Sequence, residues 1–303
     1  MKKDFLSIRD CSPEEIRRIL SLAAEIKAEP GKFSKALEGK ALAMLFEKPS
    51  LRTRVTFDVG IHQLGGFSVL LGPAEINLGK RESLPDVAKN LERMVQGIMV
   101  RTFGHDIVEK LAAHAKIPVI NGLTDLSHPC QAIGDFQTIL EVKGKLEGLK
   151  LAFVGDGNNV ASSLVLAAAL VGMRIAVASP PGYVLRAQVA SWARERAVPG
   201  FELVVTSDPV EAVQGADVVY TDVWASMGQE SEAAQRKAVF LPYQVNETLF
   251  ARAKPDAIFM HCLPAHRGEE VTDAVIDSPR SVVYQEAENR LHSQKAIMVL
   301  LMK

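Results

Sequence analysis

A polar segment near the start of the chain, EKPSLRTR at 47–54, combines residue types that suit an anion. It follows an apolar run and opens a predicted helix. Ser50, Arg52 and Thr53 therefore place hydroxyls, a guanidinium and backbone N–H groups at a helix N-terminus. A guanidinium binds two phosphate or carboxylate oxygens at once. The same residues also fit a solvated helix start capped by Ser50, so this segment alone does not decide between the two roles.

Other polar residues in the first half stand shortly after apolar runs. Arg101 follows the run GIMV, and His128, Cys130 and Gln131 enter a predicted helix some way after the run IPVI. Taken singly, His128 fits a capping or core histidine, and Cys130 fits a small buried hydrophobe. A shared role becomes the better interpretation only if the fold brings these residues together.

The second half repeats this arrangement. The residues that follow its apolar runs include Asn159, Asp222, Ser226, Met227, Gly228, His261, Cys262 and Leu263. In open α/β sheets, ligands bind outside the carboxyl ends of the strands. These residues are therefore candidates for a binding site.

Two cofactor hypotheses can be tested on the sequence. The turn GDGNN at 155–159 suggests a dinucleotide site, but only two of the three expected glycines, Gly155 and Gly157, are present. The next strand ends in ASPP, where a ribose-binding acid is expected. His261, Cys262 and His266 suggest zinc, but their spacing fits no closed structural site. The sequence therefore predicts neither a metal nor an organic cofactor.

The elements that must position these residues alternate along the chain. Ser12, Pro13 and Glu15 predict a capped first helix. Short apolar runs between helical stretches then favour parallel sheets covered on both faces. The predicted strands are ALAMLF, FSVLL, GIMV and IPVI, then LAFVGD, RIAVASP, FELVVTS, DVVYTDVW, AIFMHCLP and SVVYQEA.

This pattern predicts an α/β protein of two doubly wound domains with parallel sheets, joined by long helices. The first domain covers 1–145 and the second 146–286. A last helix, beginning at about 287, is long enough to pack back on the first domain.

Composition excludes several classes of protein. The chain has 303 residues and a net charge of −1, so no global field favours nucleic acid or an anionic membrane. Its apolar runs are too short to span a bilayer, and its N-terminus lacks the apolar core of a secretory signal. The three cysteines cannot all pair. We therefore expect a cytoplasmic protein with free thiols.

Four motifs in order resemble the aspartate/ornithine carbamoyltransferase family, and within it the members that use ornithine. The family's Ser-Thr-Arg-Thr segment stands at 50–53, with Leu51 in place of the first Thr. Its His-Pro-Cys-Gln segment is intact at 128–131, and its His-Cys-Leu-Pro segment is intact at 261–264. The family's Asp-x-x-x-Ser-Met-Gly loop is intact at 222–228.

This resemblance implies that the chain transfers a carbamoyl group from carbamoyl phosphate to the side-chain amine of L-ornithine, without a cofactor. The implied donor-binding residues are Ser50, Leu51, Arg52, Thr53, Asn77, Arg101, His128, Pro129, Cys130, Gln131, Cys262, Leu263 and Arg290. The implied ornithine-binding residues are Asn159, Asp222, Ser226 and Met227. The implied catalytic residues are Arg101, His128, Gln131, Asp222, Cys262 and Arg290.

Finer roles also follow from the resemblance. Arg101, Thr53 and His128 face the carbonyl oxygen of the donor, and Gln131 and the Leu263 carbonyl hold its NH2 end. Leu51 loses a hydroxyl but keeps its backbone N–H. Asn77 stands where the family usually has Gln, in a loop that reaches a neighbouring subunit of a homotrimer.

Members of such a family could differ in the amine that accepts the carbamoyl group, so the alternative acceptors are compared with the residues present. Aspartate would require cationic groups, whereas Asp222 suits an amine. Putrescine needs no loop of this kind for a carboxylate, and an N-acylated ornithine is the remaining alternative. An inactive ligand sensor is disfavoured by the retained Arg52, Arg101, His128 and Cys262.

Overall fold

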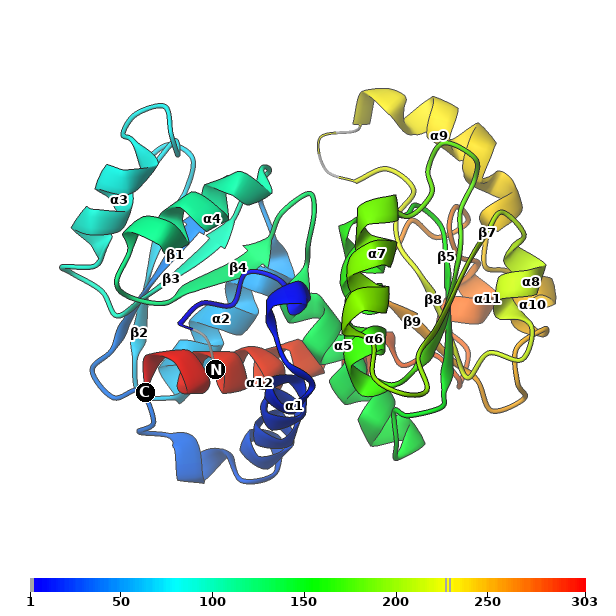
Figure 1. Cartoon of the computed structure of the whole chain (residues 1–303), viewed down its shortest axis with the longest axis horizontal. Coiled ribbons are helices and arrows are strands. Elements are labelled where there is room, and N and C mark those ends of the chain that lie inside the picture. The colour runs from blue at the N-terminus through cyan, green and yellow to red at the C-terminus, as the bar shows by residue number, and fades with distance from the viewer. Residues whose placement is uncertain (1–2, 227, 229) are drawn as a thin grey trace. The chain divides into compact units, whose positions relative to one another are not determined.

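The computed structural model describes residues 3–226, 228 and 230–303. The chain divides into two compact units. Unit 1 comprises Met1–Gln137 and Asn289–Lys303, and unit 2 comprises Thr138–Glu288. Each unit contains a parallel sheet with helices around it, which confirms the predicted fold class (Figure 1).

Unit 1 is built on a four-stranded sheet with the order β2-β1-β3-β4. Its strands are β1 (Ala41–Phe46), β2 (Phe67–Leu71), β3 (Gly97–Arg101) and β4 (Val119–Leu123). Its helices are η1 (Ile8–Asp10), α1 (Pro13–Ala28), η2 (Pro30–Phe33), α2 (Leu51–Gln63), α3 (Leu84–Leu91), α4 (His105–His114), most of α5 (Pro129–Lys143) and most of α12 (Val283–Met302).

Both faces of this sheet are covered, as Figure 1 shows. Helices α3 and α4 pack Val87, Val108 and Leu111 against Leu45 and other apolar residues on one face. Near the other face, Gly60 of α2 lies against α12, where an added Cβ would stand 3.1 Å from the Met298 side chain. Helix α1 begins with the predicted capping box, in which Ser12 and Glu15 exchange hydrogen bonds.

Unit 2 has a five-stranded parallel sheet with the order β7-β6-β5-β8-β9. Its strands are β5 (Lys150–Val154), β6 (Arg174–Ala178), β7 (Glu202–Thr206), β8 (Val218–Thr221) and β9 (Ile258–His261). Its helices include α6 (Asn159–Val171), α7 (Ala187–Arg196), α8 (Pro209–Val213), η3 (Glu230–Glu232), α9 (Ala233–Phe240), η4 (Leu241–Tyr243), α10 (Glu247–Phe250) and α11 (Asp273–Ile276).

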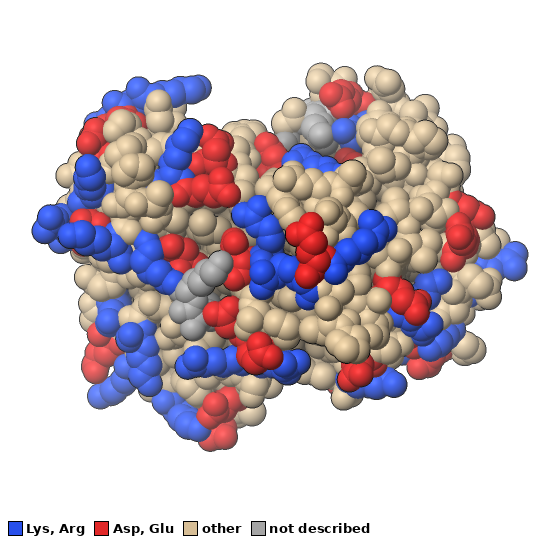
Figure 2. Space-filling view, in the orientation of Figure 1, with Lys and Arg blue, Asp and Glu red and all other residues tan. Residues whose placement is uncertain are grey.

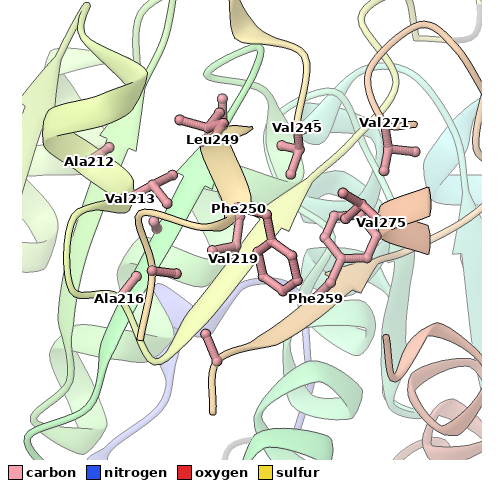
Figure 3. Close-up of a cluster of buried hydrophobic side chains, with 14 of the residues drawn as sticks. Ala212, Val213, Ala216, Val219, Val245, Leu249, Phe250, Phe259, Val271 and Val275 are labelled. Carbon is pink, nitrogen blue, oxygen red and sulfur yellow. The ribbon is translucent and has the colours of Figure 1, made fainter. Parts of the chain in front are cut away.

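The core on one face of the second sheet is drawn in Figure 3. There Val213 of α8, Phe250 of α10 and Val275 of α11 pack against Val219 of β8 and Phe259 of β9. Each side chain is almost fully buried, and a buried Val or Phe stabilises the fold by roughly 1.5 to 3 kcal/mol. This core fixes where the strands end, and hence where the residues after them lie.

One predicted strand is wrong. The run SVVYQEA has no strand beyond an isolated bridge between Ser281 and Phe259, and helix α12 begins at Val283. The Val282 N–H still donates to the Phe259 carbonyl. The chain therefore meets the sheet edge only around Phe259 and turns directly into the helix. Two neighbouring valines are a weak strand signal, which tertiary contacts override here.

The surface has no strong bias in charge on the face that Figure 2 draws, where Lys and Arg are interspersed with Asp and Glu. Along the described part of the chain, none of the helices combines the length and the apolar character that crossing a membrane requires.

Candidate active site

The strand order of each sheet marks one place for a ligand. In unit 1 the order reverses between β1 and β3, and in unit 2 it reverses between β5 and β8. Ligands of doubly wound sheets bind at the carboxyl ends of the strands beside such a reversal. Ser50 follows β1 and Arg101 ends β3, whereas Asn159 and Asp222 follow β5 and β8. These four predicted residues therefore stand at the switch point of their own unit.

In unit 1, Ser50 is the N-cap of α2. Its Oγ accepts a hydrogen bond from the Thr53 backbone N–H at 3.2 Å. Leu51 is the first residue of the helix, and its side chain is exposed. Ser50 therefore has the capping role that the sequence allowed. It is compatible with anion binding, because other N–H groups of a first helical turn have no partner within the helix.

Two guanidiniums converge on Thr53, whose side chain is fully buried. Arg290 Nη2 donates to Thr53 Oγ1 at 2.8 Å, and Arg101 Nη1 donates to the same oxygen at 3.3 Å. Both arginines are themselves buried. Neither hydrogen bond neutralises a charge, because a hydroxyl carries none. The cluster is thus a concentrated positive site suited to an anion with several oxygens.

His128 lies within the field of this cluster and is buried. Burial lowers the pKa of His128 well below its ordinary value, and Arg290, Arg101 and Arg52 lower it further. The imidazole is therefore neutral near pH 7. A neutral ring can still donate one N–H to an oxygen that gains negative charge.

Cys130 and Gln131, in the same segment as His128, form hydrogen bonds to nearby residues. The Cys130 thiol donates to the Asn121 carbonyl at 3.4 Å, and burial raises its pKa to about 12, so it stays protonated. Gln131 Nε2 donates to Asp135 Oδ1 at 2.7 Å, one turn further along α5, which Pro129 begins. Cys130 therefore serves as a buried, hydrogen-bonded residue and not as a thiolate nucleophile.

Asn77 lies apart from this cluster. It is an exposed residue in the loop between β2 and α3, with a left-handed φ of 39°. Its backbone carbonyl accepts hydrogen bonds from the Lys80 and Arg81 N–H groups. The prediction that this loop serves a neighbouring subunit stays a prediction.

In unit 2, the Asp222 carboxylate is the centre of the candidate site. Oδ2 accepts from Asn158 Nδ2 at 2.7 Å, and Oδ1 accepts from the Cys262 thiol at 3.1 Å. The Val223 N–H also donates to Oδ1 at 2.8 Å. Asp222 is buried, Cys262 is partly buried, and the carboxylate is held in one orientation by neutral donors. Such a group suits the binding of a cation.

Asn158 was not predicted from the sequence. Its Oδ1 caps α6 by accepting from the Val160 and Ala161 N–H groups, while its Nδ2 holds Asp222. The predicted Asn159 is the first residue of the same helix. The preference for Asn at a helix N-cap was the available signal. Ser226 is partly buried, and Met227 lies outside the described residues.

Arg236 is a second residue that was missed. It donates to Asp156 Oδ2 at 2.7 Å and to the Trp224 carbonyl at 2.9 Å, and it stacks over the Tyr183 ring. Burial raises the pKa of Asp156, and the bond from Arg236 opposes that shift. Arg236 thus ties the beginning of the loop after Asp222 to the end of β5. Nothing near Arg236 in the sequence signals this contact.

Local packing explains the glycine turn that suggested a dinucleotide. A Cβ at Gly157 would lie 2.3 Å from the Leu185 nitrogen, so only glycine fits. A metal site was also considered from the sequence. In the structure, the candidate ligand atoms of Asp222, His261 and Cys262 lie within 4.8 Å of one another, close enough to share a metal ion. Both ring nitrogens of His261 already have hydrogen-bonding partners, so binding a metal would cost one of these bonds.

Comparison with known proteins agrees with this geometry. The model of the aspartate/ornithine carbamoyltransferase carbamoyl-P binding domain matches residues 3–141, and that of the Asp/Orn binding domain matches residues 147–301. The chain belongs to the aspartate/ornithine carbamoyltransferase family.

Individual members of this family are similar over nearly the whole chain. The ornithine carbamoyltransferase of Thermococcus kodakarensis is 55% identical, covering 99% of this chain and 96% of that protein. The solved structure of the Pyrococcus furiosus ornithine carbamoyltransferase has a TM-score of 0.96 at 52% identity, covering 99% of this chain and 96% of its own. An acetylornithine transcarbamylase complexed with acetylcitrulline has a TM-score of 0.88 at 34% identity, covering 99% of each chain.

Proposed function

We propose that this protein transfers the carbamoyl group of carbamoyl phosphate to the side-chain amine of L-ornithine, giving L-citrulline and phosphate. One observation carries the proposal: the two units hold sites of opposite charge. The guanidiniums around Thr53 in unit 1 suit a phosphorylated donor, and the Asp222 carboxylate in unit 2 suits a diamino acid. Relatives more than 50% identical that are named ornithine carbamoyltransferases support the same substrates.

The proposed donor site assigns each residue a physical task. Ser50, Arg52, Thr53 and Arg101 bind the phosphate, with the Leu51 N–H beside them. Arg101, Thr53 and neutral His128 stabilise negative charge that develops on the carbonyl oxygen, usually the largest contribution to catalysis. The remaining donor-site residues in the proposal are Asn77, Pro129, Cys130, Gln131, Cys262, Leu263 and Arg290.

The proposed acceptor site comprises Asn159, Asp222, Ser226 and Met227, with Cys262 next to the attacking amine. That amine must be neutral to attack, yet an amine with a pKa of about 10.4 is almost wholly protonated at pH 7. A carboxylate raises the pKa of a bound amine, so Asp222 orients ornithine and does not abstract its proton. The C–N bond forms as the C–O bond to phosphate breaks. The departing phosphate takes the amine proton, and the chemistry needs no metal or organic cofactor.

The decisive experiment measures product formation with alternative acceptors. Carbamoyl phosphate is supplied with L-ornithine, N-acetylornithine, putrescine or aspartate, and the carbamoylated product is quantified. We expect efficient turnover with ornithine alone. Preferred use of N-acetylornithine or putrescine would move the function to that acceptor, and turnover with none of the four would overturn it.

We also propose a cytoplasmic homotrimer. The edge strand β2 and the exposed side of α2 carry apolar side chains that suit a subunit interface, namely Leu51, Val55, Val59, Phe67, Val69 and Leu70. Three free cysteines suit a reducing compartment. Sedimentation equilibrium tests the assembly: a fully active monomer would overturn the trimer and, with it, the proposed role of Asn77.

A further inference from the structure

The chain makes a strained turn directly after β9. Leu263 has a φ of 56°, in the left-handed region that a branched, non-glycine residue rarely adopts. Such a conformation is strained and persists only where surrounding contacts hold it. The turn also carries Cys262, whose thiol donates to Asp222. The contacts that hold it therefore bear on the candidate site.

A buried histidine holds the turn from within. The Leu263 N–H donates to His261 Nδ1 at 2.8 Å, and His261 Nε2 lies 3.2 Å from Glu270 Oε1. Because Nδ1 accepts a hydrogen bond, the ring proton sits on Nε2 and is donated to Glu270. The imidazole thus links the N–H two residues ahead of it to a carboxylate, and both side chains are fully buried.

Two buried carboxylates fix the histidine in turn. Glu270 Oε1 also accepts from the His266 N–H at 2.5 Å, which closes the loop after the turn. The His261 backbone N–H donates to Glu286 Oε2 at 2.9 Å, and Glu286 Oε1 accepts from the Tyr220 hydroxyl at 3.0 Å. Hydrogen bonds therefore hold the chain on both sides of the Leu263 carbonyl, at the Leu263 N–H and at the His266 N–H, which limits the directions that this carbonyl can take.

We propose that His261 and Glu270 are positioning residues that make the enzyme specific for the NH2 group of carbamoyl phosphate, by aiming the Leu263 carbonyl at it. The inference rests on the proposed function and on the role that the family resemblance implies for the Leu263 carbonyl, which is to hold the NH2 end of the donor. Acetyl phosphate has a methyl group where carbamoyl phosphate has NH2, so it cannot donate to that carbonyl. The ratio of the two affinities therefore measures whether the carbonyl is correctly aimed.

Two substitutions of His261 separate positioning from simple filling of the core. In His261→Asn, Oδ1 can accept the Leu263 N–H, as Asn side chains do in Asx turns, while the link to Glu270 is lost. In His261→Gln, the longer amide can still donate to Glu270 but leaves the Leu263 N–H without its acceptor. Both variants lose a buried ring and should have a lower Tm, so stability alone does not distinguish them.

The experiment titrates the full-length protein with carbamoyl phosphate and with acetyl phosphate by calorimetry. We expect the wild type to bind carbamoyl phosphate more tightly than acetyl phosphate. The ratio of the two affinities should stay within about twofold of the wild-type ratio in His261→Asn and should fall about tenfold in His261→Gln. As a matched control, His266→Asn and His266→Gln make the same changes on the exposed side of the loop and should keep the ratio. Near-UV circular dichroism verifies folding.

Three results would overturn the inference: a wild-type ratio in His261→Gln, an equal loss in both His261 variants, or no preference in the wild type. If His261→Gln does not fold, Glu270→Leu removes the acceptor of Nε2, with Glu270→Gln as its control. A lowered ratio in Glu270→Leu alone supports the inference, and an unchanged one contradicts it. Citrulline formation by the wild type is assayed separately, so that a failure of the proposed function can be told apart from a failure of this inference.

Discussion

Arg290 donates from Nη2 to the Thr53 hydroxyl at 2.8 Å, although the two residues stand 237 positions apart. This bond ties the C-terminal helix α12 to the first turn of α2 within unit 1. Arg101 shares the same acceptor oxygen. Thr53 therefore organises two guanidiniums, and a test of the donor site begins with its hydroxyl.

Thr53→Val keeps the shape of the side chain and removes that oxygen. Two buried guanidiniums then lose an acceptor, which costs on the order of 1 to 3 kcal/mol for each group left without a partner. We expect carbamoyl phosphate affinity to fall about 10- to 100-fold, as measured by calorimetry. Thr53→Ser retains the hydroxyl and should stay within a few-fold of the wild type. Equal losses in Ser and Val would mean that the methyl group, and not the oxygen, matters.

Arg101→Ala removes a buried charge from the same cluster. We expect carbamoyl phosphate binding to become undetectable, because charge-assisted bonds to phosphate are lost and the cluster is disrupted. Arg54→Ala, an exposed arginine on the same helix as Thr53, serves as the control and should bind normally. Normal turnover in Arg101→Ala would rule out this anion site.

Asp222→Asn tests the acceptor site alone. Loss of the negative charge should raise the KM for ornithine about 100-fold or more, while carbamoyl phosphate affinity measured by calorimetry stays near the wild-type value. Asn keeps the volume and one acceptor oxygen for the Cys262 thiol and the Val223 N–H. Equal weakening of both substrates would indicate misfolding and count against a separate ornithine site.

Much of the fold could be predicted from the sequence, because continuous apolar runs mark buried parallel strands and their ends. ALAMLF and RIAVA became strands, whereas SVVYQEA became the start of α12. The capping box at Ser12 was also visible, since its two partners are three residues apart. These features depend on neighbours in the sequence.

The contacts that complete the candidate site in each unit depend on residues far apart in the sequence. Arg290 was identified by resemblance, and nothing local connects it with Thr53. Asn158 was overlooked beside Asn159, because its bond to Asp222 spans 64 positions. His261 was considered as a zinc ligand, while its actual partners are the Leu263 N–H and Glu270. Such bonds exist only after the sheets have formed.

The depressed pKa of His128 predicts how stability depends on pH. Burial, then Arg290, Arg101 and Arg52, disfavour the charged ring in the folded state. Below the ordinary histidine pKa of about 6.5, the unfolded state binds a proton that the folded state does not. This residue's contribution is therefore lost as pH falls, with a slope that approaches ~1.4 kcal/mol per pH unit. The Tm of His128→Gln should decline less between pH 6.5 and 5 than that of the wild type; parallel curves would contradict the shift.

The two bonds of Asn158 can be separated by substitution. Asn158→Ser keeps an N-cap for α6 but loses the donor to Asp222, whereas Asn158→Ala loses both. We expect Ala to lower the free energy of unfolding by about 1 kcal/mol relative to Ser, since capping by a hydroxyl is worth that much. Both should raise the KM for ornithine about tenfold, because Asp222 loses the bond that orients it. A wild-type KM in Asn158→Ser, with stability retained, would show that Val223 and Cys262 suffice to orient the carboxylate.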